Sequence, residues 1–203
     1  MPTAPKLDLY KVHKAEYVTP KKPALIETKP AKYLTITGQG APGGEAFQKR
    51  VGALYAVAFT LKMAKEFAGK DYRVCHLEGL WWGEKEAENF ALQPPNSWNW
   101  KLIIRVPDFI GAKDLKDTTA TLKEKGKLPE VSEVKLETLD EGQCVQMLHV
   151  GPYSKEGGTI SQMIALAAEN GLSCHGLHHE IYLSDPRRVP PERLRTLLRL
   201  PVA

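Results

Sequence analysis

The stretch Lys32-Tyr33-Leu34-Thr35-Ile36-Thr37-Gly38 decides the fold, because it begins a succession of elements that the chain later repeats. Its residues are β-branched and alternate in character, and a glycine ends the run, which is typical of a strand. Residues 45–67 then carry apolar side chains at three- and four-residue steps, which predicts a long helix. Strands are predicted next over residues 74–82 and 98–106. The order is therefore strand, helix, strand, strand.

The same order returns in the second half of the chain. Residues 134–150 predict strands on either side of the turn Asp140-Glu141-Gly142. A helix is predicted over residues 154–169, and further strands over residues 173–184 and 196–202.

We therefore predict an α+β domain over residues 31–203. Its tandem strand-helix-strand-strand units, at about residues 31–106 and 133–203, form one antiparallel sheet with a helical insertion between them. We expect the helices on one face of the sheet and a ligand cleft on the other. Residues 1–30, rich in Lys and Pro, predict an extended leader, because their prolines oppose a long helix.

The bulk composition restricts the classes of partner. The chain has 28 basic and 24 acidic residues, spread along its length without a basic stripe, so we expect no nucleic-acid partner. Its three cysteines include no paired motif, which indicates a reducing compartment. Neither a secretory signal nor a membrane-spanning stretch is evident, so we expect a cytoplasmic protein with no membrane partner. The oligomeric state is left open.

Glu180 is the strongest candidate for chemistry. Strand alternation places His178, Glu180 and Tyr182 on one face of their strand. On a partly desolvated aromatic wall, a carboxyl group acquires a raised pKa and can act as a general acid or base, or pair with a cationic ligand. The alternative is a glutamate on the solvated face of a half-exposed sheet.

Glu78 holds the corresponding position in the first unit, in phase with Trp82. Two carboxylates related by a pseudo-two-fold axis could flank one ligand, although each could also be a solvated strand residue. Three tryptophans, Trp82, Trp98 and Trp100, are candidate ligand-binding aromatics, whereas Trp81 is more simply explained as core.

Tyr153 follows Gly151-Pro152 where a strand meets a helix, so it could reach a ligand or pack at the helix entry. His178 and Glu180 could supply two metal ligands, but no third ligand has convincing spacing, so we predict no metal. The chain has no P-loop, dinucleotide fingerprint or nucleophile elbow, and we expect no cofactor.

Four segments together resemble the GyrI-like small-molecule-binding family, which is related to the effector-binding domains of multidrug-sensing transcription activators. They are Tyr33-Leu34-Thr35-Ile36-Thr37-Gly38, Glu78-Gly79-Leu80-Trp81-Trp82, His149-Val150-Gly151-Pro152-Tyr153 and His179-Glu180-Ile181-Tyr182-Leu183-Ser184-Asp185-Pro186. The resemblance covers about residues 31–202. It implies two strand-helix-strand-strand units, a ligand site between them and Glu180 as the central polar residue.

Two functions follow from the resemblance. One is a stand-alone protein that binds lipophilic or cationic compounds in an aromatic cleft. The other is a hydrolase that opens the strained cyclopropane of DNA-alkylating compounds and so protects the cell, because some stand-alone members resemble such hydrolases. In that case Glu180 would orient or deprotonate water, while Tyr153, Trp82 and Trp100 hold a flat substrate. Binding-only relatives share the same glutamate, so the resemblance does not decide between the two.

Overall fold

The computed structural model describes residues 6–83, 93–126 and 128–203, and its centre is one antiparallel sheet of eight strands. In spatial order the strands run β1-β6-β8-β7-β3-β4-β2-β5. Their bounds are β1 (Ala24–Glu27), β2 (Ala31–Gln39), β3 (Glu78–Trp82), β4 (Asn99–Arg105), β5 (Lys135–Leu139), β6 (Gln143–Val150), β7 (His178–Tyr182) and β8 (Arg195–Pro201).

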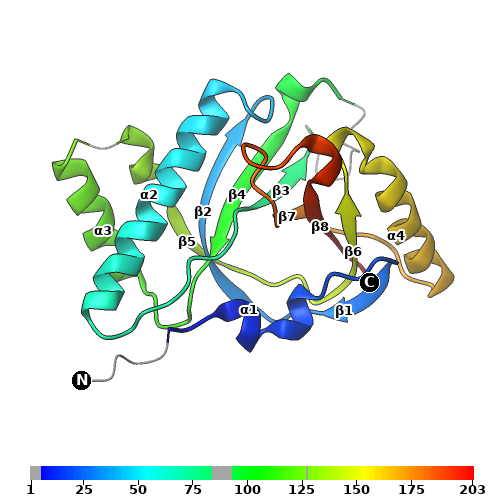
Figure 1. The fold of residues 1–203 in the computed structure, drawn as a ribbon, viewed down its shortest axis with the longest axis horizontal. Helices are drawn as coiled ribbons and strands as arrows, with labels where there is room; N and C mark the ends of the chain where they lie inside the picture. Colours follow the sequence, from blue (N-terminus) through cyan, green and yellow to red (C-terminus); the bar gives the residue numbers. More distant parts are fainter. Residues whose placement is uncertain (1–5, 84–92, 127) are drawn as a thin grey trace.

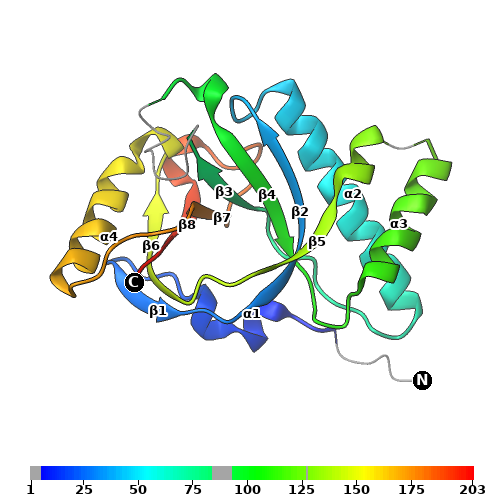
Figure 2. The same cartoon turned by 180° about the vertical axis from the view of Figure 1, so that it is seen from behind.

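Four α-helices accompany the sheet in the described part of the chain. They are α1 (Leu9–Val12), α2 (Glu45–Phe67), α3 (Ala112–Glu124) and α4 (Gly157–Glu169). In Figure 1, α2 lies at one end of the curved sheet and α4 at the other. Figure 2 shows from behind that β5 lies beside β2, at the edge of the sheet nearest α2 and α3. None of the helices in the described residues is long and apolar enough to cross a bilayer.

The predicted α+β fold of two strand-helix-strand-strand units is confirmed. The first unit is β2-α2-β3-β4 and the second is β6-α4-β7-β8. Because β7 pairs with β3, the two units join side by side into one sheet. The second unit's leading strand β6 pairs antiparallel with β8 on one side and with β1 on the other.

Helices α2 and α4 cover the same side of the sheet, which we call the helix face. Under α2, Leu34, Leu102 and Ile104 are fully buried and pack with the helix residues Leu54 and Leu61. Trp100 lies across Gly38 on the neighbouring strand, where a β-carbon would come within 2.2 Å of its ring. Glycine at position 38 is therefore required for this indole to fill the core.

Under α4 the core is smaller and chemically similar. Val145 and Met147 of β6 and Leu198 of β8 pack against Met163 and Ala167 of the helix. Ile164, on the outer side of α4, is 49% exposed. The gap between the α2 and α4 cores is where β3 meets β7, and this junction positions the candidate site.

The other side of the sheet, the strap face, is covered by an N-terminal strap formed by residues 7–20. Glu16 lies in the 3₁₀ turn Lys14–Tyr17 and forms a 2.7 Å ion pair with Arg105 of β4. Its backbone carbonyl accepts from Arg199 of β8 and from Gln146 of β6. The segment called a leader thus contains α1, this turn and β1, and it closes one face of the sheet (Figure 1).

Candidate functional site

The pairing of β3 with β7 decides which side chains share a face. Gly79 lies opposite Glu180, and Glu78 lies opposite Ile181. Since opposed residues of an antiparallel pair project to the same side, Glu180 lies on the helix face and Glu78 on the strap face. The two carboxylates therefore do not flank one ligand. The expected ligand cleft opposite the helices is also wrong for Glu180, which lies on the same face as α2 and α4.

Three of the predicted residues gather around Glu180. His178 Nε2 lies 3.1 Å from Glu180 Oε1, and the two residues are 9% and 7% exposed. Tyr182 lies on the same face of β7, and burial together with the Glu180 carboxylate raises the Tyr182 pKa well above its ordinary value. The ring of Tyr153 stands edge-on to that of Tyr182, with centroids 6.0 Å apart.

Tyr153 gives the cluster its contact with solvent, because 39% of the residue is exposed. Burial and then the charge of Glu180 raise the pKa of its phenol to about 12, so at neutral pH it is a neutral hydrogen-bond donor. It lies in the 3₁₀ turn Tyr153–Lys155 that leads into α4. Tyr153 thus lies between β6 and α4, as predicted from its place where a strand meets a helix.

Glu156, at the N-terminus of α4, is the fifth member of the cluster, and sequence reasoning missed it. It is 5% exposed and its carboxyl lies against that of Glu180. Burial, followed by the charge and hydrogen bond of Glu180, holds the pKa of Glu156 well above its usual range. Its Oε1 atom and the Oγ1 atom of neighbouring Thr196 have no conventional hydrogen-bond partner. A proton held between the two carboxyls would satisfy this arrangement, because two buried adjacent carboxylates cannot both ionise without a large cost.

Two tryptophans, Trp81 and Trp98, border the Glu180 cluster on the side of α2. The indole N–H of Trp81 donates to the Tyr182 hydroxyl at 3.0 Å, although the residue is 4% exposed and packs in the α2 core. Half-buried Trp98 stands edge-on to Trp81, with centroids 6.1 Å apart. Trp81 therefore belongs both to the core, as predicted, and to the Glu180 cluster, which it joins through its hydrogen bond to Tyr182.

Three predicted ligand-binding residues do not join this cluster. Trp82 follows Trp81 on the strand and so projects to the strap face. Trp100 is 0% exposed, and its N–H donates to the carbonyl of Gly40 at 3.1 Å, so it is part of the core under α2. Glu78 is fully buried on the strap face.

Glu78 belongs to a buried ion network instead. His179 lies between two carboxylates, with Nε2 2.9 Å from Glu78 and Nδ1 2.9 Å from Glu141. Burial alone would favour the neutral imidazole, but the two carboxylates raise the His179 pKa to about 9. Against the same desolvation, His179 and Arg199 lower the pKa of Glu141 to about 2. The network explains the carboxylate at position 78 without a ligand.

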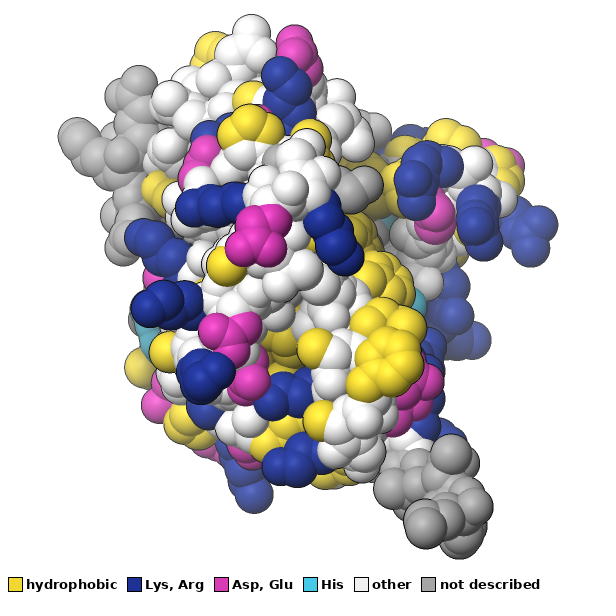
Figure 3. Space-filling view, turned by 90° about the vertical axis from the view of Figure 1, so that its left-hand side faces the viewer, with side chains coloured by type: hydrophobic (Ala, Val, Ile, Leu, Met, Phe, Trp, Pro, Cys, Tyr) yellow, Lys and Arg dark blue, Asp and Glu magenta, His cyan; other side chains and the backbone are white. Residues whose placement is uncertain are grey.

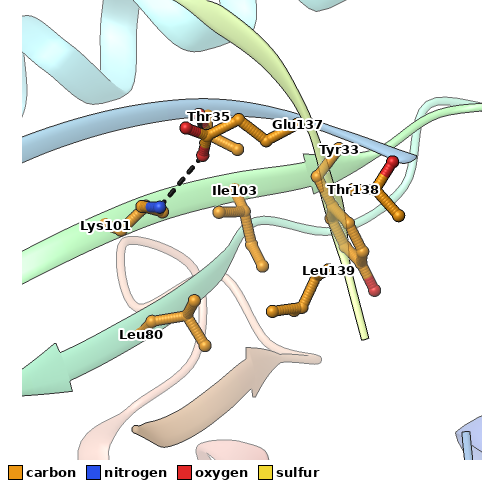
Figure 4. Close-up of a pocket in the computed structure, with 8 residues that line it drawn as sticks. All are labelled: Tyr33, Thr35, Leu80, Lys101, Ile103, Glu137, Thr138 and Leu139. Atoms are coloured by element: carbon orange, nitrogen blue, oxygen red, sulfur yellow. Dashed lines mark hydrogen bonds and ion pairs between the residues drawn. The ribbon is translucent and has the colours of Figure 1, made fainter. Parts of the chain in front are cut away.

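Two hollows lie away from the Glu180 cluster. On the strap face a cavity of about 40 Å³ is lined by Leu80, Ile103 and Leu139 beside the ion pair of Lys101 with Glu137 (Figure 4). This volume suits a few water molecules rather than an organic ligand. A shallow apolar hollow of about 630 Å³ lies on the outer side of α2, lined by Gly52, Tyr55, Ala56, Phe59, Thr60, Leu122, Gly126 and Leu128. On the side of the molecule drawn in Figure 3, basic, acidic and apolar side chains are mixed over the surface.

A metal could in principle use the cluster, because one ligand atom each of Glu156, His178 and Glu180 lies within 4.8 Å of the others. Glu156 would thus be the third metal ligand, which the spacing of residues in the sequence did not reveal. A cation here would compete with the contact between Glu180 and His178, whereas a proton on Glu156 fits beside it. The absence of a metal stays a prediction.

Comparison with known proteins places this geometry in a family. The GyrI-like small molecule binding domain matches residues 21–203. The chain belongs to this family. No functionally curated protein matches the GyrI-like chain significantly.

Solved structures resemble the GyrI-like chain over its whole length. An uncharacterized conserved protein from Listeria innocua is 40% identical with a TM-score of 0.89, and the match covers 98% of this chain and 100% of that one. A structure described as a hydrolase from Listeria innocua is 38% identical with a TM-score of 0.87, with the same coverage. The C-terminal domain of EcmrR, at 11% identity and a TM-score of 0.59, shares the fold over 90% of this chain and 97% of that domain.

Proposed function

We propose that this GyrI-like protein is a hydrolase of electrophilic small molecules, with Glu180 as the base that activates water and Glu156 as the acid. The observation that carries the proposal is the pair of contacting, buried carboxyls on the helix face, one of which needs a proton. A pair of carboxyls in opposite protonation states supplies an acid and a base at the same pH. The 38% identity over the full length to a protein described as a hydrolase supports the proposal.

The reaction we propose is the addition of water to a strained, electrophilic cyclopropane conjugated to a carbonyl group. Glu180 takes a proton from water while the water oxygen bonds to a ring carbon. The ring C–C bond breaks, and its electron pair passes through the conjugated system to the carbonyl oxygen, which receives the proton of Glu156. Transfer of the new proton from Glu180 to Glu156 restores the enzyme, so the net change is the addition of one water molecule.

Aromatic groups beside the carboxyls would hold a flat, lipophilic substrate. Tyr153 is the most exposed, and Tyr182 and Trp98 are half-buried. In this proposal Tyr153 keeps the role that the sequence suggested, and Tyr182 and Trp98 take the place of Trp82 and Trp100. The neutral phenol of Tyr153 could also donate a hydrogen bond to the substrate carbonyl. A small lipophilic or aromatic molecule is therefore the partner we propose, without nucleic acid or membrane.

Mass spectrometry with a cyclopropane-bearing DNA-alkylating compound tests the assignment of Glu180. We expect steady formation of a product heavier by one water with the wild type, and a loss of about 10²–10⁴-fold in its rate with Glu180→Gln. The matched control is Glu169→Gln, an exposed residue at the end of α4, which should react as the wild type does. Equal rates for Glu180→Gln and the wild type would refute the role of Glu180.

A binding protein without turnover is the second candidate. The observation that favours it is the buried negative charge beside aromatic rings, a setting that suits lipophilic cations. It predicts that a lipophilic quaternary phosphonium binds the wild type and that Glu180→Gln weakens this binding. The hydrolase predicts instead that Glu180→Gln retains its neutral substrate unreacted, so a binding titration of both compounds separates the two.

A further inference from the structure

His149, near the end of β6, connects that strand to the turn that carries Tyr153. Met147, two positions earlier on β6, packs against α4, so strand alternation turns His149 to the helix face as well. The imidazole is 6% exposed. Its Nδ1 lies 2.9 Å from the hydroxyl of Thr159 in α4, and its Nε2 lies 3.2 Å from the carbonyl oxygen of Pro152. The ring therefore joins β6 both to the helix and to the residue directly before Tyr153.

The chemistry of the two partners assigns the hydrogen atoms of this ring. A carbonyl oxygen can only accept, so Nε2 must carry a hydrogen and donate it to Pro152. In the neutral ring, Nδ1 then accepts the hydroxyl proton of Thr159. The Pro152 carbonyl also accepts from the backbone N–H of Lys155 at 2.9 Å, which closes the 3₁₀ turn. His149 thus adds a side-chain hydrogen bond to the same oxygen atom that begins the turn.

The backbone before Pro152 has a conformation that glycine adopts readily and other residues do not. Gly151 has a φ of 137°, in the region that a β-carbon disfavours. Its N–H donates to the carbonyl of Leu194, the residue before β8, at 2.9 Å. The chain is therefore held to the sheet at Gly151 and by His149 at Pro152, immediately before Tyr153.

Glu156 is held in a different way. Its backbone carbonyl accepts from the N–H groups of Thr159 and Ile160, so the first turn of α4 fixes its position. Tyr153 precedes the helix and depends on the turn that leads into it. Loss of the hydrogen bond from His149 should therefore release Tyr153 and leave Glu156 in place.

We infer that His149 is a positioning residue, which holds the Pro152 carbonyl through Nε2 and so keeps the phenol of Tyr153 beside Glu180. This inference rests on the proposed function, because Tyr153 is the group that we propose to hold the substrate and to donate to its carbonyl oxygen. The imidazole is buried and both of its nitrogens are engaged, so its effect on the reaction passes through Tyr153.

Fluorine NMR of the full chain labelled with 3-fluorotyrosine follows the position of Tyr153, whose signal is assigned with Tyr153→Phe. His149→Asn keeps a polar group at the place of Nδ1 but is too short to reach Pro152, so we expect the Tyr153 signal to move. His149→Gln is the matched variant, because its amide nitrogen can take the place of Nε2, and we expect the signal to stay near its wild-type position. Unchanged signals of Tyr10 and Tyr17 in the strap would show that the fold is intact. An unmoved Tyr153 signal in His149→Asn, or an equal displacement in both variants, would overturn the inference.

Turnover of the cyclopropane compound gives an independent reading. His149→Asn should lower kcat/KM about tenfold, mainly through KM, while His149→Gln stays within about threefold of the wild type. In a Tyr153→Ala background, His149→Asn should cause no further loss, because the group that His149 positions is already absent. A second loss of about tenfold in that background would show that His149 acts by another route, and would overturn the inference.

The two measurements separate this inference from the proposed function. If the wild type turns over nothing but the fluorine signals respond as expected, the proposed function fails and the positioning of Tyr153 by His149 stands. If turnover occurs and the Tyr153 signal does not respond to His149→Asn, the positioning role fails alone.

Discussion

Glu156 is buried at the start of α4 next to another carboxyl. The carboxyl that we propose for catalysis therefore also lowers the stability of the fold. Its pKa is raised above the ordinary 4.5, so on unfolding the group releases a proton at neutral pH. Stability from this group is therefore lost progressively as pH rises above about 4.5. We predict that Glu156→Gln lowers turnover yet raises the free energy of unfolding at pH 7 by about 1–3 kcal/mol.

Urea denaturation at several pH values measures this effect. Glu156→Gln should reduce the decline in stability above pH 5 without removing the part that His179 causes above pH 6.5, and the exposed Glu169→Gln on the same helix should follow the wild type. A Glu156→Gln variant that is less stable than the wild type across this range would show that the carboxyl is not held in the protonated form.

His179 makes the opposite kind of contribution on the strap face. Its pKa is raised from an ordinary 6.5 to about 9, so its ion pairs stabilise the fold fully below pH 6.5 and are lost as pH rises through 9. Glu141, lowered from 4.5 to about 2, stabilises the fold above pH 4.5 and loses this effect as pH falls towards 2. In a Glu156→Gln background, we predict that stability still declines between pH 6.5 and 9, and that His179→Gln removes this decline. A decline that survives His179→Gln would place its origin elsewhere.

Single residues also mark the limit of sequence reasoning. Alternation correctly placed His178, Glu180 and Tyr182 on one face, because each strand fixes its own phase. It could not relate the phase of β3 to that of β7, because the register between strands depends on pairing, and so the sequence left open whether Glu78 shares a face with Glu180. Glu156 was missed for a similar reason: only the path of the chain into α4 brings it to Glu180.

At the scale of elements, the sequence predicted the long and periodic ones well. The helix over residues 45–67 is α2, and strands β2, β4 and β8 lie within one residue of their predicted ends. The helix predicted from residue 154 begins at Gly157, because a 3₁₀ turn precedes it. The N-terminal strap was predicted only as extended, because its order comes from tertiary contacts with Arg105, Arg199 and Gln146 rather than from local periodicity.

The strap allows a prediction for an element. Glu16 places a carboxylate, 8% exposed, against the Arg105 guanidinium, 4% exposed. Removing it leaves a buried, uncompensated charge, so we predict that Glu16→Ala lowers the free energy of unfolding by about 3–5 kcal/mol. Lys14→Ala in the same turn, where the side chain is exposed, should change it by less than about 0.5 kcal/mol. Equal urea midpoints for the two variants would mean that the strap does not stabilise the sheet.

In the whole molecule the two faces of the sheet carry out different tasks. The strap face holds charged groups in a closed network with Arg199, Glu141 and His179. The helix face leaves a polar cluster between the α2 and α4 cores, where the two units of the family fold meet. The tandem architecture could be predicted from the repeated order of elements. The choice of face could not, because helix placement and strap contacts exist only after folding.

The most direct test of the account is to run the reaction of the cyclopropane compound in heavy-oxygen water and follow the product by mass spectrometry. The account predicts that the wild type yields a product carrying one oxygen atom from the solvent, over many turnovers per protein molecule. It predicts that Glu180→Gln yields none above the uncatalysed rate while still retaining the compound. Retention of unreacted compound by the wild type itself, with no labelled product, would contradict the hydrolase and leave a binding protein.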